Sequence, residues 1–265
     1  IKNGSGLNNA IIYTYYSSIH IDNLVFTNDI GSRLLDVRYS HSFSANDLKA
    51  KDNYLSSDAF YIFYSFANFD IHNVEIVDNK FYSAFNFYYG SSNQNGELSN
   101  ALIAGNHTTS GSVISSYQYR GNFILNHNTI VDNYDVYGGG IRSLYHAVDQ
   151  NYSGTAVRIV GNILQSGDNE AIKINDYSTF AVNAVNNLTD GSNFISTNSL
   201  TPTEQNTRKG VLDFDANYTP TAYNQALGGS KLSVTVGGSV VAAPAIDLKG
   251  NSRPWNVGEQ PDMGA

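Results

Sequence analysis

The chain has no cysteine, which excludes disulfide bonds, thiolate metal sites and cysteine nucleophiles. Charged residues make up only 14 % of its 265 residues, and the few Lys and Arg are dispersed over a chain of net charge −8. A basic surface for nucleic acid is therefore missing. No stretch approaches the roughly 18 apolar residues of a membrane-spanning helix. We predict no nucleic-acid partner and no transmembrane segment, and a fold held by apolar stacking and hydrogen bonds.

Asn, Ser, Gly and Tyr are abundant instead, with 19 tyrosines and 23 glycines. This composition is typical of a β-rich protein that functions outside the cytoplasm. The sequence begins at Ile1 without the charged and apolar regions of a secretory signal, so we expect a mature form or a fragment.

Two apolar segments alternate along the chain and recur about every 25 residues. Both alternate apolar and polar residues, as half-buried strands do. The first segment places one column of inward residues at Ile21, Ala50, Ile71, Leu98, Leu125 and Ile159. The second places another at Ile12, Leu35, Phe60, Phe85, Ile114, Ile141 and Ile172. Two columns with matching periods predict one winding of stacked coils.

We therefore predict an all-β fold, a right-handed parallel β-helix, in which each coil buries its apolar side chains against its neighbours. Coils are expected over residues 1–200. Residues 201–265, where all five prolines fall, are expected to form irregular C-terminal coils and a cap of the same domain. Gly237 and Gly238 separate two apolar runs, which could form a small hairpin or a further strand pair there.

An Asn-rich turn follows the first segment of most coils. Asn tolerates left-handed backbone conformations, and its amide can bond to the same amide one coil away. We interpret these residues as structural, namely Asn23, Asn73, Asn100, Asn128 and Asn162.

The C-terminal stretch APAIDLKGNSRPWNVGEQPDMGA resembles the closing motif of bacterial β-helix proteins of the choice-of-anchor Q type. Pro244 to Asp247 match the first part of that motif, Gly250, Arg253 and Pro254 the second, and Pro261 to Ala265 the third. The resemblance spans roughly residues 120–265. It implies export to the cell surface or medium, often in Bacteroidetes, and carries no universal catalytic motif.

Outward side chains of the second segment form an aromatic band over the first coils. Aromatic rings stack on each other and on the apolar faces of sugars, so the band could bind a glycan or a protein partner. The alternative is that one of these columns points inward, since a slip of one residue exchanges the faces. The candidate ligand-binding residues are Tyr15, Tyr39, Tyr61, Phe63, Tyr64, Tyr88, Tyr89 and Tyr117.

Arg142 and Lys173 are expected to be neighbours in adjacent coils. In a polysaccharide lyase such cations would neutralise the carboxylate of an acidic sugar and supply the base, often with Ca²⁺ held by acidic residues. The other interpretation is a solvated surface pair compensated by Asp168, Glu170 or Asp176. The histidines lack the spacing of a zinc site, and no metal site or other cofactor is predicted.

Two functions remain open. The favoured one is a secreted or outer-membrane-surface β-helix that binds a glycan or a surface protein partner without catalysis, as an adhesin does. The alternative is a lyase-like enzyme acting on an acidic polysaccharide. The sequence supplies an aromatic surface more clearly than an acid–base constellation.

Overall fold

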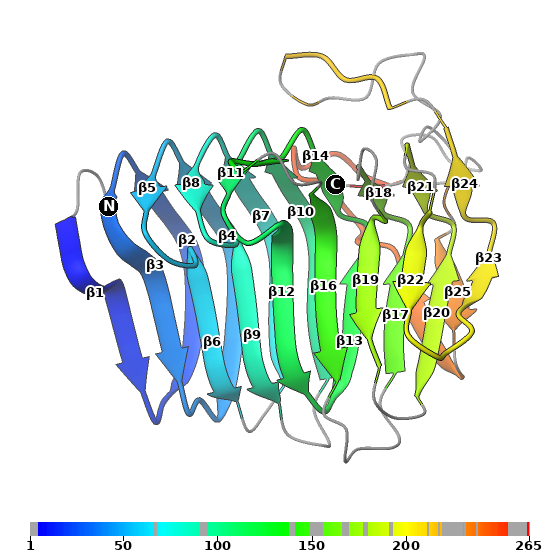
Figure 1. Ribbon diagram of the computed structural model, residues 1–265, viewed down its shortest axis with the longest axis horizontal. Coiled ribbons are helices and arrows are strands. Elements are labelled where there is room, and N and C mark those ends of the chain that lie inside the picture. The colour runs from blue at the N-terminus through cyan, green and yellow to red at the C-terminus, as the bar shows by residue number, and fades with distance from the viewer. Residues whose placement is uncertain are drawn as a thin grey trace.

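A computed structural model confirms the parallel β-helix (Figure 1). Right-handed winding stays a prediction, based on the strong preference of parallel crossovers for that hand. None of the described residues forms a helix, so none of them provides a helix able to cross a membrane. The structure describes residues 5–65, 68–90, 95–137, 141–148, 156–165, 170–176, 180–190, 193–210, 212–216, 218, 230, 232–236, 238–253 and 264.

Two 12-stranded parallel sheets face each other across the core, and we name them sheets A and B. In sheet B, long strands stack in chain order with their carboxyl ends at one edge (Figure 1). They are β1 (Ser5–Tyr15), β3 (Ile30–Arg38), β6 (Phe60–Ser65), β9 (Phe85–Gly90), β12 (Ser112–Tyr119), β16 (Arg142–Val148), β19 (Ile172–Asn175) and β22 (Ile195–Thr197). Short strands extend the same sheet at β5 (Tyr54–Leu55), β8 (Lys80–Phe81), β11 (His107–Thr108) and β15 (Tyr134–Asp135).

Sheet A begins with four long strands, β2 (Ser18–Thr27), β4 (Ser42–Lys51), β7 (Phe69–Val77) and β10 (Asn95–Ala104). In later coils each long strand is divided into two at a corner. The pairs are β13 (Asn122–Asn126) with β14 (Thr129–Val131), β17 (Ala156–Val160) with β18 (Ile163–Leu164), β20 (Ala181–Val185) with β21 (Leu188–Thr189), and β23 (Thr203–Gln205) with β24 (Arg208–Lys209).

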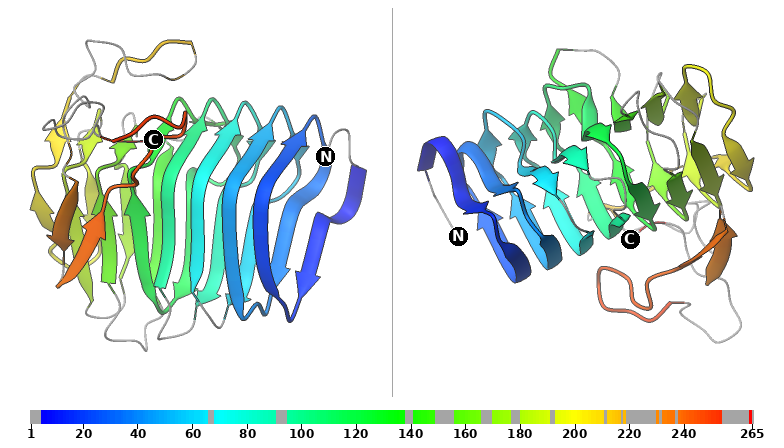
Figure 2. Two further views of the ribbon diagram at one scale, coloured as in Figure 1. Left: turned by 180° about the vertical axis from the view of Figure 1, so that it is seen from behind. Right: turned by 90° about the horizontal axis from the view of Figure 1, so that it is seen from below.

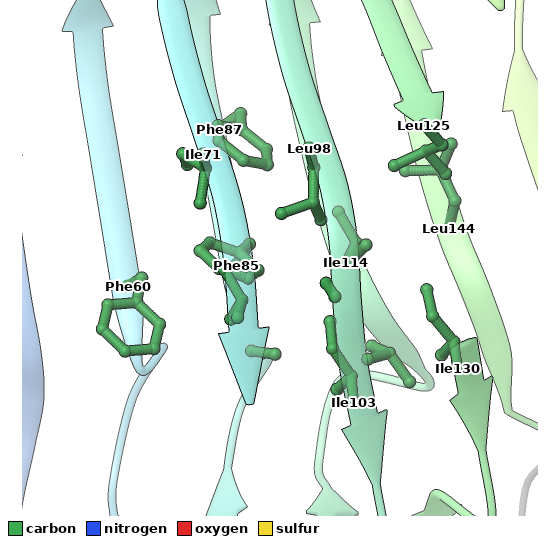
Figure 3. Close-up of a cluster of buried hydrophobic side chains, with 14 of the residues drawn as sticks. Phe60, Ile71, Phe85, Phe87, Leu98, Ile103, Ile114, Leu125, Ile130 and Leu144 are labelled. Carbon is green, nitrogen blue, oxygen red and sulfur yellow. The ribbon is translucent and has the colours of Figure 1, made fainter. Parts of the chain in front are cut away.

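Inward rows of both sheets form one apolar core (Figure 3). The predicted row of Leu35, Phe60, Phe85 and Ile114 is confirmed, since these residues lie opposite one another and are fully buried. The rings of Phe60 and Phe85 stack with centroids 5.2 Å apart. Phenylalanine therefore fills the inside of the coils, and the period-two alternation sends most tyrosines outward.

The predicted columns were wrong at two positions. Ala50 lies opposite Ile76, and Ala45 is the residue that continues the column to Ile71. The cause is a left-handed corner at Asp47, which separates two inward pairs within β4.

In β16, Leu144 rather than Ile141 continues the core row between Ile114 and Ile172. Leu144 was expected to point outward, yet it is fully buried. The predicted column therefore placed Ile141 at the position that Leu144, three residues later in the chain, occupies.

Two of the corners are built from small polar residues. Asn23, Asn73 and Asn100 have left-handed backbones with φ of 54°, 56° and 53°. Asn128 and Asn162 follow the same corner and bond amide to amide at 3.0 Å. The structural interpretation of the Asn-rich turn is confirmed in both respects.

A second and longer asparagine ladder occupies the next corner. The amide nitrogens of Asn53, Asn79 and Asn106 each donate to the amide oxygen of the following coil at 2.8 or 2.9 Å. Each accepting oxygen also accepts from a backbone N–H. These amides are satisfied in the core without water, which ties consecutive coils together. The ladder consists of Asn53, Asn79, Asn106 and Asn133.

The predicted hairpin near Gly238 is also confirmed, as the antiparallel pair β25 (Ser233–Val236) and β26 (Ser239–Ala242). It packs on the outer side of sheet A, where Val236 and Val241 contact Val160 and Val185 (Figure 2, left). The chain then returns along this side, and Arg253 donates to Asn100 at 2.9 Å. Sheet A is thus partly covered by the C-terminal segment.

Candidate functional site

The predicted aromatic residues whose side chains the structure describes lie on the outer face of sheet B, at the carboxyl ends of its strands. Two outward rows cross the first coils in register. One contains Tyr13, Asp36, Tyr61, Asn86 and Ser115, and the other Tyr15, Arg38, Phe63, Tyr88 and Tyr117. Both rows were expected to face outward, and their neighbours on either side are the buried core rows. The inward alternative is therefore wrong for this part of the sheet.

Aromatic rings from six consecutive coils are in contact. Each ring contacts the next one in the series Tyr15, Tyr39, Phe63, Tyr88, Tyr117 and Tyr145. The distances between the centroids of successive rings are 5.2, 5.6, 5.7, 6.0 and 5.3 Å, in that order. These distances are typical of favourable aromatic pairs. We call this surface the aromatic band. It also includes Tyr13, Tyr16, Tyr61 and Tyr89.

The band is accessible along its whole length. Tyr13, Tyr15 and Tyr16 are 51 %, 49 % and 57 % exposed, and the rings from Tyr39 to Tyr145 are half-buried by their neighbours. The side chain of Tyr64, the remaining predicted residue, lies outside the described part of the structure.

An ionic network supports the first coils of the band. Arg33 and Arg38 donate to Asp36 at 3.0 and 2.8 Å, and Arg33 lies 4.0 Å from Asp58. Both guanidinium groups also lie against the ring of Tyr61, at 4.3 and 5.7 Å from its centroid. Each of these guanidinium groups therefore contacts both a carboxyl group and an aromatic ring of the protein.

Burial shifts the pKa values of two groups in this network, Asp58 and Tyr61. It raises the pKa of Asp58, against the opposing effect of hydrogen bonds from Ser83 and Asn86. Burial also raises the pKa of Tyr61 to about 12, so its phenol is neutral at physiological pH. Asp36 and Asp58 are only 4 % and 5 % exposed at their side chains, which places them beneath the surface rather than at it.

The corner that ends these strands differs from the other two. Its left-handed positions hold Tyr16, Tyr39, Tyr89 and Gln118, with φ between 50° and 57°. The other corners use Asn, Asp, Gly or His at the equivalent position. A bulky residue in this conformation is unusual and costs about 1 kcal/mol or more. Three strained tyrosines therefore line one edge of the band.

The predicted pairing of Arg142 with Lys173 is wrong. Arg142 lies opposite Ser112, and Tyr145 lies opposite Lys173. Arg142 instead donates to Glu170 at 2.7 Å. Burial alone would raise the pKa of Glu170, but the hydrogen bond and charge of Arg142, together with the charge of Lys173, lower it. Of the compensating acids considered for this cation, Asp168 lies outside the described residues, and Glu170 is the one of the other two that contacts it.

Sequence reasoning missed Tyr145 and the network around Asp36. Tyr145 would have been found by aligning Leu144 and His146, rather than Ile141, with the inward rows.

Among the described residues, no group of three or more His, Asp and Glu is placed to hold a metal ion. No family model, curated protein or solved structure matches this chain.

Proposed function

We propose that this protein is an extracellular or cell-surface β-helix that binds a glycan through the aromatic band, without catalysis. The observation that carries the proposal is the unbroken run of accessible rings from Tyr15 to Tyr145. Contiguous aromatic rings at a protein surface, unlike single scattered ones, are typical of a binding site. Tyrosine suits a wet sugar-binding surface because its ring is apolar and its hydroxyl remains hydrated.

The compartment rests on the sequence. Low charge, abundant Asn, Ser, Gly and Tyr, and the resemblance of the closing segment to exported bacterial β-helix proteins support an extracytoplasmic location. The described part of that closing segment packs on sheet A, which leaves the aromatic face of sheet B uncovered by it.

The lyase alternative loses the arrangement that motivated it. The expected pair of cations is not formed, because Arg142 is bound to Glu170 and lies three positions before Tyr145, the residue opposite Lys173. We expect no unsaturated product, followed by ultraviolet absorbance, from alginate, pectate or chondroitin with or without Ca²⁺. A signal that disappears in Lys173→Ala would contradict non-catalytic binding.

The direct test is affinity electrophoresis through gels containing soluble polysaccharides. Tyr88→Ala removes a ring that contacts both Phe63 and Tyr117, so the band is interrupted at its centre. One lost stacking contact of about 1.4 kcal/mol corresponds to about tenfold weaker binding.

Tyr137→Ala is the matched control, since Tyr137 is 81 % exposed and lies outside the band. Retardation lost in Tyr88→Ala but kept in Tyr137→Ala, with unchanged circular dichroism, supports the proposal. Equal retardation of both variants, or binding of a protein ligand only, contradicts it.

A further inference from the structure

The shape of the aromatic band limits what it can hold. Rings continue from coil to coil across the strands, whereas along a strand they span only neighbouring positions such as Tyr61 and Phe63, 5.9 Å apart. The long direction of the band is therefore the solenoid axis, with a step of about 4.8 Å per coil. An occupant that covers it must be a narrow, extended chain.

The charge of the band limits the chemistry of that chain. Asp36 already binds Arg33 and Arg38, and Arg33 also lies near Asp58. Both guanidinium groups are already in contact with carboxyl groups of the protein, so neither is free to pair with an acidic sugar. A polyanion would in addition be repelled by the net charge of −8.

The strained tyrosines give an independent reason to expect a ligand here. At Tyr16, Tyr39 and Tyr89 an Asn or Gly would relieve the left-handed backbone, as it does at the other corners. Tyrosine at these positions instead places a ring on the band. The rings of Tyr16 and Tyr39 stack at 5.1 Å, and Tyr89 lies 4.7 Å from Tyr88. Strain that recurs at one edge of a surface points to use of that edge.

We infer that the ligand is an uncharged, extended polysaccharide that lies along the solenoid axis, with successive sugar units on the rings of successive coils. This inference rests on the proposed function and adds the orientation, the charge class and the role of the strained tyrosines. The rings present apolar platforms to the flat faces of neutral sugars.

The test is calorimetric titration with neutral oligosaccharides of increasing length, from the dimer to the octamer, and with acidic oligosaccharides of the same lengths. We expect neutral ligands only to bind, with affinity rising at each added unit until the band is covered. Affinity that stops rising at the dimer or trimer, or preference for acidic ligands, would overturn the inference while leaving glycan binding intact. Absence of binding to every glycan would overturn the proposed function itself.

A variant separates the strained tyrosines from folding. Tyr39→Asn keeps a residue that suits the left-handed corner but removes the ring, so we expect about tenfold weaker binding of the longest ligand with little change in thermal midpoint. Tyr54→Asn is the control, because Tyr54 is 55 % exposed on β5, outside the band. Unchanged affinity in Tyr39→Asn would overturn the role assigned to this corner. Should Tyr39→Asn fail to fold, Tyr16→Asn, at the more exposed end of the band, provides the same comparison.

Discussion

His146 is a fully buried imidazole in the core of the β-helix, and replacing it should stabilise the protein. Its ring lies among Tyr119, Phe123 and Phe180, with centroids 6.0, 5.5 and 6.4 Å away. Neither ring nitrogen has a hydrogen-bond partner in the described part of the chain. Burial lowers the pKa of His146 to about 3. The imidazole is therefore neutral when the protein is folded and takes up a proton below pH 6.5 when it is unfolded.

The sign of the pH effect follows from this difference. Between pH 6.5 and about 3 the unfolded state binds one more proton at His146 than the folded state, so the unfolding free energy falls as pH falls. Going from pH 7 to pH 5 should lower it by about 2 kcal/mol for this group. The contribution of His146 to stability is complete above pH 6.5 and decreases through that window.

His146→Leu removes both the proton uptake and the unpaired nitrogens at similar side-chain volume. We expect the unfolding free energy to rise by about 1 kcal/mol at pH 7 and about 3 kcal/mol at pH 5. His127, whose pKa is also lowered to about 3 by burial, first, and by the charge of Arg253, remains in the variant. The pH dependence contributed by the two buried histidines should therefore be roughly halved rather than abolished.

Urea unfolding at both pH values, followed by circular dichroism, measures these changes. Ile174→Leu is the matched control, because Ile174 follows His146 in the same inward row and does not titrate. Its effect should be the same at both pH values. Stabilisation by His146→Leu that is equal at pH 5 and pH 7 would refute the reasoning, since it would mean that His146 does not bury a neutral imidazole.

Two further predictions concern the corners. Asn106→Ala breaks a buried amide ladder and should lower the unfolding free energy by about 2–4 kcal/mol in urea titrations, whereas Asn122→Ala, in an exposed amide pair, should lower it by less than about 1 kcal/mol. Equal effects would show that the ladder does not hold the coils. Gly161→Ala should cost more than about 2 kcal/mol, because φ is 66° and the new Cβ would lie 2.5 Å from the ring of His127. Gly238→Ala, at φ 76° with no atom within 4 Å, should cost about 1 kcal/mol, and a larger loss there would contradict the steric explanation.

The sequence by itself was enough to predict the fold class. It left the faces of the first coils open, because both alternating sets of a segment such as DAFYIFYS contain aromatic residues. The structure decided that Phe60 and Ile62 are buried while Tyr61 and Phe63 face outward. A repeat near 25 residues then places such segments beside one another. Local chemistry was also sufficient for the asparagine corners, because few other residues adopt the left-handed backbone at low cost.

Only the tertiary structure decided the exact register and the pairing of charges. Ala45 and Ala50 both follow the inward pattern, and the corner at Asp47 separates them by a bend that alternation does not encode. The register of β16 depends on hydrogen bonds to β12 and β19 across loops of unequal length, so a local pattern placed Ile141 where Leu144 lies. For the same reason the partner of Arg142 is Glu170, one coil away, because the stacking of coils rather than the order of residues determines which charges meet.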